Sequence, residues 1–108
     1  MDSNTLSQEV TALHAELCAA IADPRRILML YALSEHACNV GDLSSHLGIS
    51  QPATSRHLKI LRERGLVLAA REGANVEYRL ADTRLIEALD LLRGVLRDHL
   101  AYRASLVE

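Results

Sequence analysis

The run QPATSRHLKILRER, at positions 51–64, holds the side chains best suited to chemistry in this sequence. At helical spacing, one face of the run collects Thr54, Leu58 and Leu61, which would pack inward. The other face would present groups that bind phosphates and base edges, namely Gln51, Ser55, Arg56, Lys59 and Arg62. An arginine fork matches O6 and N7 of guanine together, so Arg56 is the first candidate for reading a base. The run predicts a helix that enters the major groove of DNA.

Charge is unevenly distributed along the chain. The net charge is −2, yet six of the 12 basic residues and only three of the 14 acidic residues lie between Gln51 and Arg79. A positive face on an acidic body indicates phosphate binding by one surface. An ordinary solvated helix face is the alternative interpretation for Glu63 and Arg64.

A second set of reactive side chains consists of two histidines and two cysteines: His14, Cys18, His36 and Cys38. His14 and Cys18 are four residues apart, so they share one helix face and could supply two ligands. A site shared across a dimer and a Cys18–Cys38 redox pair are both open, but buried structural cysteines are the favoured interpretation. Within one subunit the intervening helix would span about 16 Å, which is beyond disulfide reach.

The elements that must position these groups follow from end signals and periodicity. Thr5 and Gln8 can form a capping box, Asp23-Pro24 starts a central buried helix, and Asp82 starts the last one. After Gly65 the pattern alternates, which predicts a β-hairpin with its charged turn at 71–75. We expect one domain over residues 1–108, with helices over about 5–21, 24–35, 40–47, 51–64 and 83–105 and a hairpin over about 66–80.

Both terminal helices carry more leucine than a small core needs. The surplus predicts a dimer interface made by Leu6, Leu13, Leu85, Leu89, Leu92 and Leu96. The alternative is that these side chains simply pack on the central helix.

Three segments together resemble the ArsR/SmtB family of bacterial transcriptional repressors: ADPRRILMLYAL, VGDLSSHLGISQPATSRHLKILRERGLV and REGANVEYRL. The resemblance covers roughly residues 10–100 and implies a mainly α winged helix-turn-helix fold. It also implies a homodimer that binds an inverted-repeat operator in double-stranded DNA and leaves it when an inducer binds.

Carried over to this sequence, the family's DNA contacts fall on the helix over 51–64 and on the wing. Gln51, Thr54, Ser55, Arg56 and His57 would lie nearest the bases, and Lys59 and Arg62 would touch phosphates. On the wing, Arg71 and Asn75 would grip the backbone or reach the minor groove. Packing is an equal alternative for Thr54 and His57.

The inducer sites known in the family are not matched here. The thiolate motif C-V-C-D-L corresponds to Asn39-Val40-Gly41-Asp42-Leu43, and Arg84 stands where the zinc sensors place a histidine after Asp82. Sulfide-responsive members use cysteines in the second and last helices, where this chain has Met29 and no cysteine. We therefore expect no metal and no cofactor, and the inducer stays unidentified.

Other function classes find less support. The sequence has no CxxC, nucleophile elbow or other catalytic constellation, so we do not expect an enzyme. No apolar run is long enough to span a membrane, and the first residues lack the features of a signal peptide, which favours the cytoplasm. A winged-helix module that docks an acidic protein partner is the alternative to a DNA-binding regulator.

Overall fold

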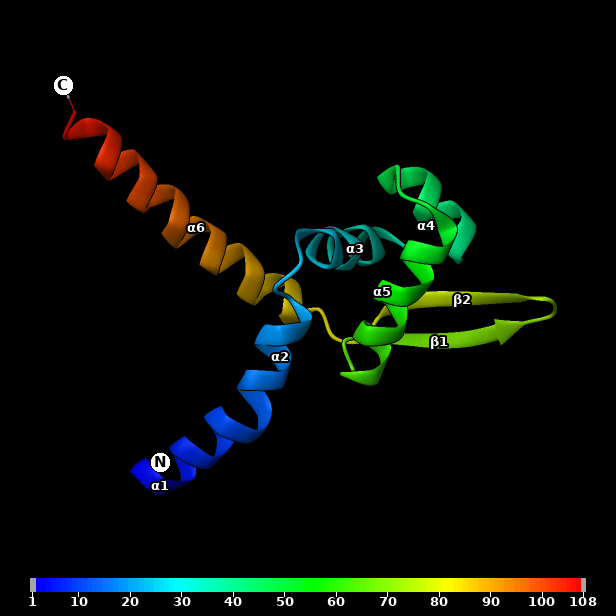
Figure 1. The fold of residues 1–108 in the computed structure, drawn as a ribbon, viewed down its shortest axis with the longest axis horizontal. Coiled ribbons are helices and arrows are strands. Elements are labelled where there is room, and N and C mark those ends of the chain that lie inside the picture. Colours follow the sequence, from blue (N-terminus) through cyan, green and yellow to red (C-terminus); the bar gives the residue numbers. More distant parts are fainter. Residues whose placement is uncertain (1, 108) are drawn as a thin grey trace.

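The computed structural model describes residues 2–107 of the chain and is mainly helical, with one two-stranded hairpin (Figure 1). Its elements are α1 (Ser3–Glu9), the π-helical segment η1 (Val10–His14), α2 (Ala15–Ala20), α3 (Pro24–Glu35), α4 (Val40–Leu47), α5 (Gln51–Glu63), β1 (Val67–Glu72), β2 (Asn75–Leu80) and α6 (Arg84–Ser105). This order, with the hairpin directly after α5, confirms the winged helix-turn-helix expected from the sequence.

The N-terminal helical run starts earlier than the sequence suggested. The Asp2 carboxylate accepts a hydrogen bond from the backbone N–H of Thr5 at 2.8 Å, so the helix begins at Ser3. The predicted capping box of Thr5 and Gln8 was therefore wrong, because both residues already lie inside the helix. The backbone stays helical through the π-helical segment into α2, and the three elements form one continuous rod.

The next three helices each start directly after a residue whose side chain caps the first turn. The side chains of Asp23, Asn39 and Ser50 each accept a hydrogen bond from a backbone N–H in the first turn of α3, α4 and α5. Gly48 follows α4 with a φ of 69°, a left-handed conformation that glycine adopts without strain. The short link from Gly48 to Ser50 sets α5 against α4.

The core lies around α3, whose Met29, Leu30 and Leu33 are buried. The other elements contribute further apolar side chains to this cluster, among them Leu43, Leu58, Leu61, Val67 and Leu89. Helix α5 is amphipathic, so burying Leu58 and Leu61 leaves its polar face on the outside. The core therefore fixes which face of α5 meets a ligand.

The hairpin covers the predicted range, but its strands are longer and its turn is tighter than the sequence predicted. Strands β1 and β2 pair antiparallel from Val67 with Leu80 to Glu72 with Asn75, leaving Gly73 and Ala74 as a two-residue turn. Gly73 has a φ of 61°, as such turns require. The other edge of β2 pairs with the backbone of Cys38, which anchors the wing to the loop before α4.

Two helical arms leave the core on the side away from the hairpin (Figure 1). One arm is the rod from α1 to α2, and the other is α6. Both expose apolar side chains, namely Leu6, Val10, Leu13, Leu91, Leu92, Val95, Leu96, Leu100 and Tyr102. Among the helices within residues 2–107, none combines the length and the apolar character needed to cross a membrane.

Candidate nucleic-acid interface

Helix α5 presents five of the predicted contact residues on its outer face. Gln51, Ser55, Arg56, Lys59 and Arg62 are all exposed. Pro52 lies in the first turn of the helix, where its missing N–H costs nothing, and Ser50 caps that turn. The exposed face therefore runs from the N-terminus of α5 along most of its length.

Two other predicted contacts on α5 point into the protein. Thr54 is fully buried, and its hydroxyl donates to the carbonyl oxygen of Ser50 at 2.9 Å. His57 is 8% exposed, and its Nδ1 lies 3.2 Å from a guanidinium nitrogen of Arg26. Both side chains make contacts within the fold, which favours the packing alternative for Thr54 and His57.

A groove of about 490 Å³ runs between α5 and the wing. Its walls are Ser55, Lys59, Arg62 and Glu63 from α5 and Tyr78 from β2. Sequence reasoning missed Tyr78, because its alternation with Val76 and Leu80 suggested an inward position. The groove brings two of the predicted phosphate contacts, Lys59 and Arg62, to one surface.

The wing carries the remaining predicted contacts near its tip. Arg71 and Asn75 are exposed and flank the turn, where Arg71 pairs with Val76 and Asn75 with Glu72. Asn75 also lines a hollow between the hairpin and the start of α4, together with Asn39 and Asp42. Arg71 and Asn75 therefore lie near the tip of the hairpin and do not line the groove that holds Lys59 and Arg62.

Within residues 2–107, four basic groups of α5 and the wing lack the ion pairs that Arg25 and Arg84 make. Arg25 pairs with Asp23 and Arg84 with Asp82, and these contacts lower the pKa of each carboxyl to about 2. Within the part of the chain that the structure describes, Arg56, Lys59, Arg62 and Arg71 make no such ion pair. Their charges are available to an anionic ligand such as the DNA backbone.

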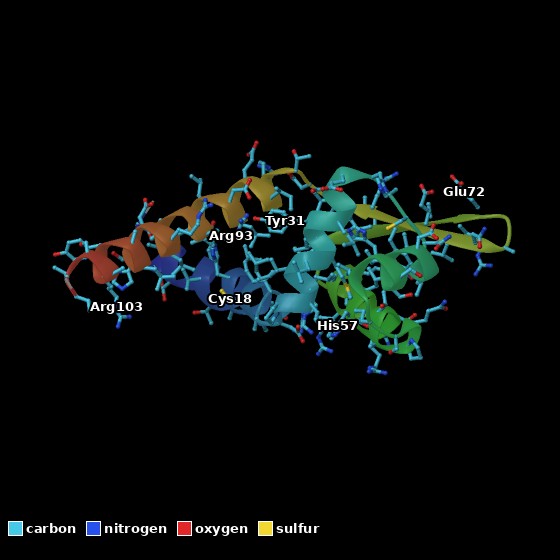
Figure 2. All side chains as sticks on the ribbon, turned by 90° about the horizontal axis from the view of Figure 1, so that it is seen from above. Cys18, Tyr31, His57, Glu72, Arg93 and Arg103 are labelled. Carbon is cyan, nitrogen blue, oxygen red and sulfur yellow. The ribbon has the colours of Figure 1, made fainter. Side chains whose placement is uncertain are left out.

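The four predicted inducer or redox residues fall into two separate pairs. His14 and Cys18 are exposed on the N-terminal arm, where Figure 2 shows Cys18. His36 and Cys38 line a pocket of about 260 Å³ between α3 and α4 that Asp42 and His46 also border. The expectation of a buried Cys18 was wrong for the single subunit, because no core covers the arm at that position.

Neither pair forms a ready metal or redox centre. Both cysteines are free thiols, and burial, together with nearby Asp42 and Glu77, raises the pKa of the half-buried Cys38 thiol. A raised pKa disfavours the thiolate, which is the form that binds metals and reacts with oxidants. Among residues 2–107, no three His, Cys, Asp or Glu side chains are placed to hold a metal ion.

The predicted dimer residues divide between the arms and the core. Leu6, Leu13, Leu92 and Leu96 are exposed on the arms. Leu89 is buried in the subunit's own core, and Leu85 packs against that core while staying partly exposed. The side chain of Leu89 is therefore used within the subunit, and the surface open to a partner lies farther along α6.

Comparison with known proteins adds independent information. The profile of the family described as "Bacterial regulatory protein, arsR family" matches residues 23–68. The chain is 46% identical over 83 residues to the HTH-type transcriptional regulator CmtR of Mycobacterium tuberculosis, covering 76% of this chain and 70% of CmtR. It is 41% identical over 78 residues to the biofilm growth-associated repressor of Agrobacterium fabrum, covering 69% of this chain and 67% of that protein.

A solved structure repeats the architecture. The homodimeric winged helix-turn-helix DNA-binding domain of Mb0332 from Mycobacterium bovis superposes with a TM-score of 0.77 at 25% identity. The match covers 94% of this chain and 93% of that domain, so it includes both arms as well as the hairpin.

Proposed function

Since this chain belongs to the ArsR family of bacterial regulatory proteins, we propose that it is a homodimeric transcriptional repressor that binds an inverted-repeat operator. The observation that carries the proposal is the exposed face of α5, whose Arg56, Lys59 and Arg62 make no ion pair within residues 2–107. The relative from Agrobacterium fabrum is named a repressor, which supports repression as the direction of regulation.

In this proposal α5 of each subunit enters the major groove. Gln51, Ser55 and Arg56 lie in the first turns, from which a recognition helix reaches base edges. Lys59 and Arg62 hold phosphates along the groove beside the wing, while Arg71 and Asn75 meet the backbone farther out. Two such helices in one dimer would read half-sites about one helical turn, ~34 Å, apart.

The exposed apolar arms supply the dimer contact in this account. Leu6 and Leu13 lie on one arm and Leu92 and Leu96 on the other, and all four are exposed in the single subunit. Burial of exposed apolar side chains in a shared interface is the usual reason for a stable homodimer. The homodimeric Mb0332 domain has the same overall fold, which supports this assignment.

We also propose that an inducer releases the protein from its operator. The pair on the arm, His14 and Cys18, and the pair beside α4, His36 and Cys38, are the residues to vary when inducers are screened. The absence of a resident metal or cofactor, the absence of catalysis and a cytoplasmic location stay predictions.

The test is selection of duplexes from random-sequence DNA by the purified protein, followed by competition with scrambled duplexes. We expect the selected sequence to be an inverted repeat that binds at least about 10³-fold more tightly than scrambled DNA. Its affinity should fall steeply with salt, because phosphate contacts release counterions. A protein that selects nothing, or that binds every duplex equally, would contradict sequence-specific regulation.

A further inference from the structure

Arg26 joins three helices through a single side chain. It lies on α3, and its guanidinium donates to the carbonyl oxygens of Ala19 and Ala20 at the end of α2. A third guanidinium nitrogen lies 3.2 Å from Nδ1 of His57, on the inner face of α5. One residue therefore connects the N-terminal arm to the helix proposed to read DNA.

The chemistry of the contact fixes the state of His57. A guanidinium is always charged and can only donate, so Nδ1 of His57 must accept. The imidazole is then neutral and carries its proton on Nε2, which lies 4.0 Å from the Asp23 carboxylate. Charged groups thus face both ring nitrogens, and the Arg26 contact is the one within hydrogen-bond distance.

The Arg26 contacts lie where the N-terminal arm meets the core, so they affect the orientation of that arm. The end of α2 is anchored in the core through Ala20, which is 1% exposed, and the same rod extends outward to the exposed Leu6 and Leu13. Figure 1 shows this arm meeting the core beside α5. If the arms join two subunits, the angle between α2 and α5 determines how far apart and at what rotation the two α5 helices lie.

We propose that Arg26 is a positioning residue that holds α5 in a fixed orientation to the N-terminal arm and so sets the half-site spacing that the dimer accepts. The inference rests on the proposed function, because it needs a dimer that reads two half-sites. It concerns geometry rather than contact, since Arg26 lies on α3 and binds protein groups with all three of its described contacts.

The experiment measures spacing preference. The probes are the duplex selected by the wild-type protein and the same half-sites moved one base pair closer or farther apart. One base pair rotates the half-sites by about 35°, so we expect the wild type to prefer the selected spacing by at least about tenfold. Arg26→Gln should bind the three probes within about threefold of one another while remaining a dimer by size.

Arg25→Gln is the matched control. Arg25 neighbours Arg26 on α3 and pairs with Asp23, but its described hydrogen bonds reach neither α2 nor α5. We expect it to keep the wild-type preference. His57→Leu is the second variant, because it removes the acceptor on α5, fills the space and leaves the contacts to α2; it should lose the preference as Arg26→Gln does.

The outcomes separate the inference from the function on which it rests. A wild-type spacing preference retained by either folded variant would overturn the role of Arg26, and so would an equal loss in Arg25→Gln. Failure of the wild type to select any duplex would overturn the proposed function and the inference with it. Folding is checked first by the melting temperature of each variant.

Discussion

The hydroxyl of Tyr31 donates to the Asp90 carboxylate at 2.7 Å and thereby ties α3 to the base of the α6 arm. Arg93 completes the cluster, since it donates to the Tyr31 oxygen at 3.0 Å and its guanidinium lies 5.2 Å from the centre of the ring. Figure 2 shows Tyr31 and Arg93 next to each other where α6 leaves the core. The direction of the α6 arm therefore depends on these side-chain contacts as well as on its covalent link to the hairpin.

Tyr31→Phe should lower the free energy of unfolding by about 0.5–1.5 kcal/mol, because it removes the two solvent-exposed hydrogen bonds of the hydroxyl, to Asp90 and from Arg93, and leaves the ring in place. Urea unfolding at a fixed protein concentration measures the change, since dimer stability depends on concentration. Tyr102→Phe is the control, because within residues 2–107 the Tyr102 hydroxyl makes no described hydrogen bond and the side chain is exposed. Equal effects of the two variants would argue against the cluster.

Leu30→Ala should cost about 2–5 kcal/mol of unfolding free energy. Leu30 is fully buried on α3, so truncation leaves a cavity at the centre of the core. Leu68→Ala, on the exposed side of β1, should cost much less. Chemical denaturation of both variants makes the comparison, and a small loss for Leu30→Ala would contradict the central place of α3.

Arg56→Ala should weaken binding to the selected duplex by about 1–3 kcal/mol, since a bidentate contact to guanine would be lost. Fluorescence anisotropy with labelled duplexes measures the loss. Arg103→Ala, near the end of α6, removes the same charge away from α5 and should have little effect. An equal loss on selected and scrambled duplexes would reassign Arg56 to a phosphate.

Leu92→Asp should convert the dimer to weakly associating monomers. Leu92 is 56% exposed on α6, so a charge there is harmless to the subunit but costly in an apolar interface. Sedimentation velocity at micromolar concentration reads the oligomeric state, with Leu68→Asp on the wing as the control. A Leu92→Asp protein that sediments as a dimer would place the interface elsewhere.

The stability of the protein should fall as the pH drops below 6.5. Burial lowers the pKa of His57 from its ordinary value, opposed by Asp23 and aided by Arg25, Arg26 and Arg56. The unfolded chain then takes up a proton first, so the unfolding free energy decreases between pH 6.5 and the lower pKa of the folded state. Above pH 6.5 both states are neutral and this contribution is constant.

Urea unfolding of the wild type and His57→Leu between pH 5 and 8 isolates this effect. The wild type should lose stability relative to His57→Leu on acidification, because the variant lacks the titrating group. A constant difference across the range would show that His57 does not bind fewer protons in the folded state.

Local signals in the sequence predicted most of the fold. Asp23, Asn39 and Ser50 cap helices through atoms only a few residues away, so their roles can be recognised from the sequence alone. The early start of α1 at Ser3 was missed because Asp2 lies before the capping box that Thr5 and Gln8 suggested. A π-helical segment leaves no mark in an apolar periodicity, and η1 was missed for that reason.

The candidate site was less predictable where it depends on contacts distant in sequence. The outward residues of α5 follow from its periodicity, but Arg26 contacts His57 across 31 positions of the chain. No spacing rule relates two such residues. The exposure of Cys18 likewise depends on how far the arm extends from the core, which the sequence around it does not indicate.

The most direct test of the central claim is dimethyl sulfate footprinting on the selected duplex, since N7 of guanine lies in the major groove. We predict that wild-type protein protects guanine N7 in two clusters about one helical turn apart and that Arg56→Ala loses protection at one guanine in each cluster. Unprotected guanine N7 in both half-sites, with the protein bound, would contradict the placement of α5 in the major groove.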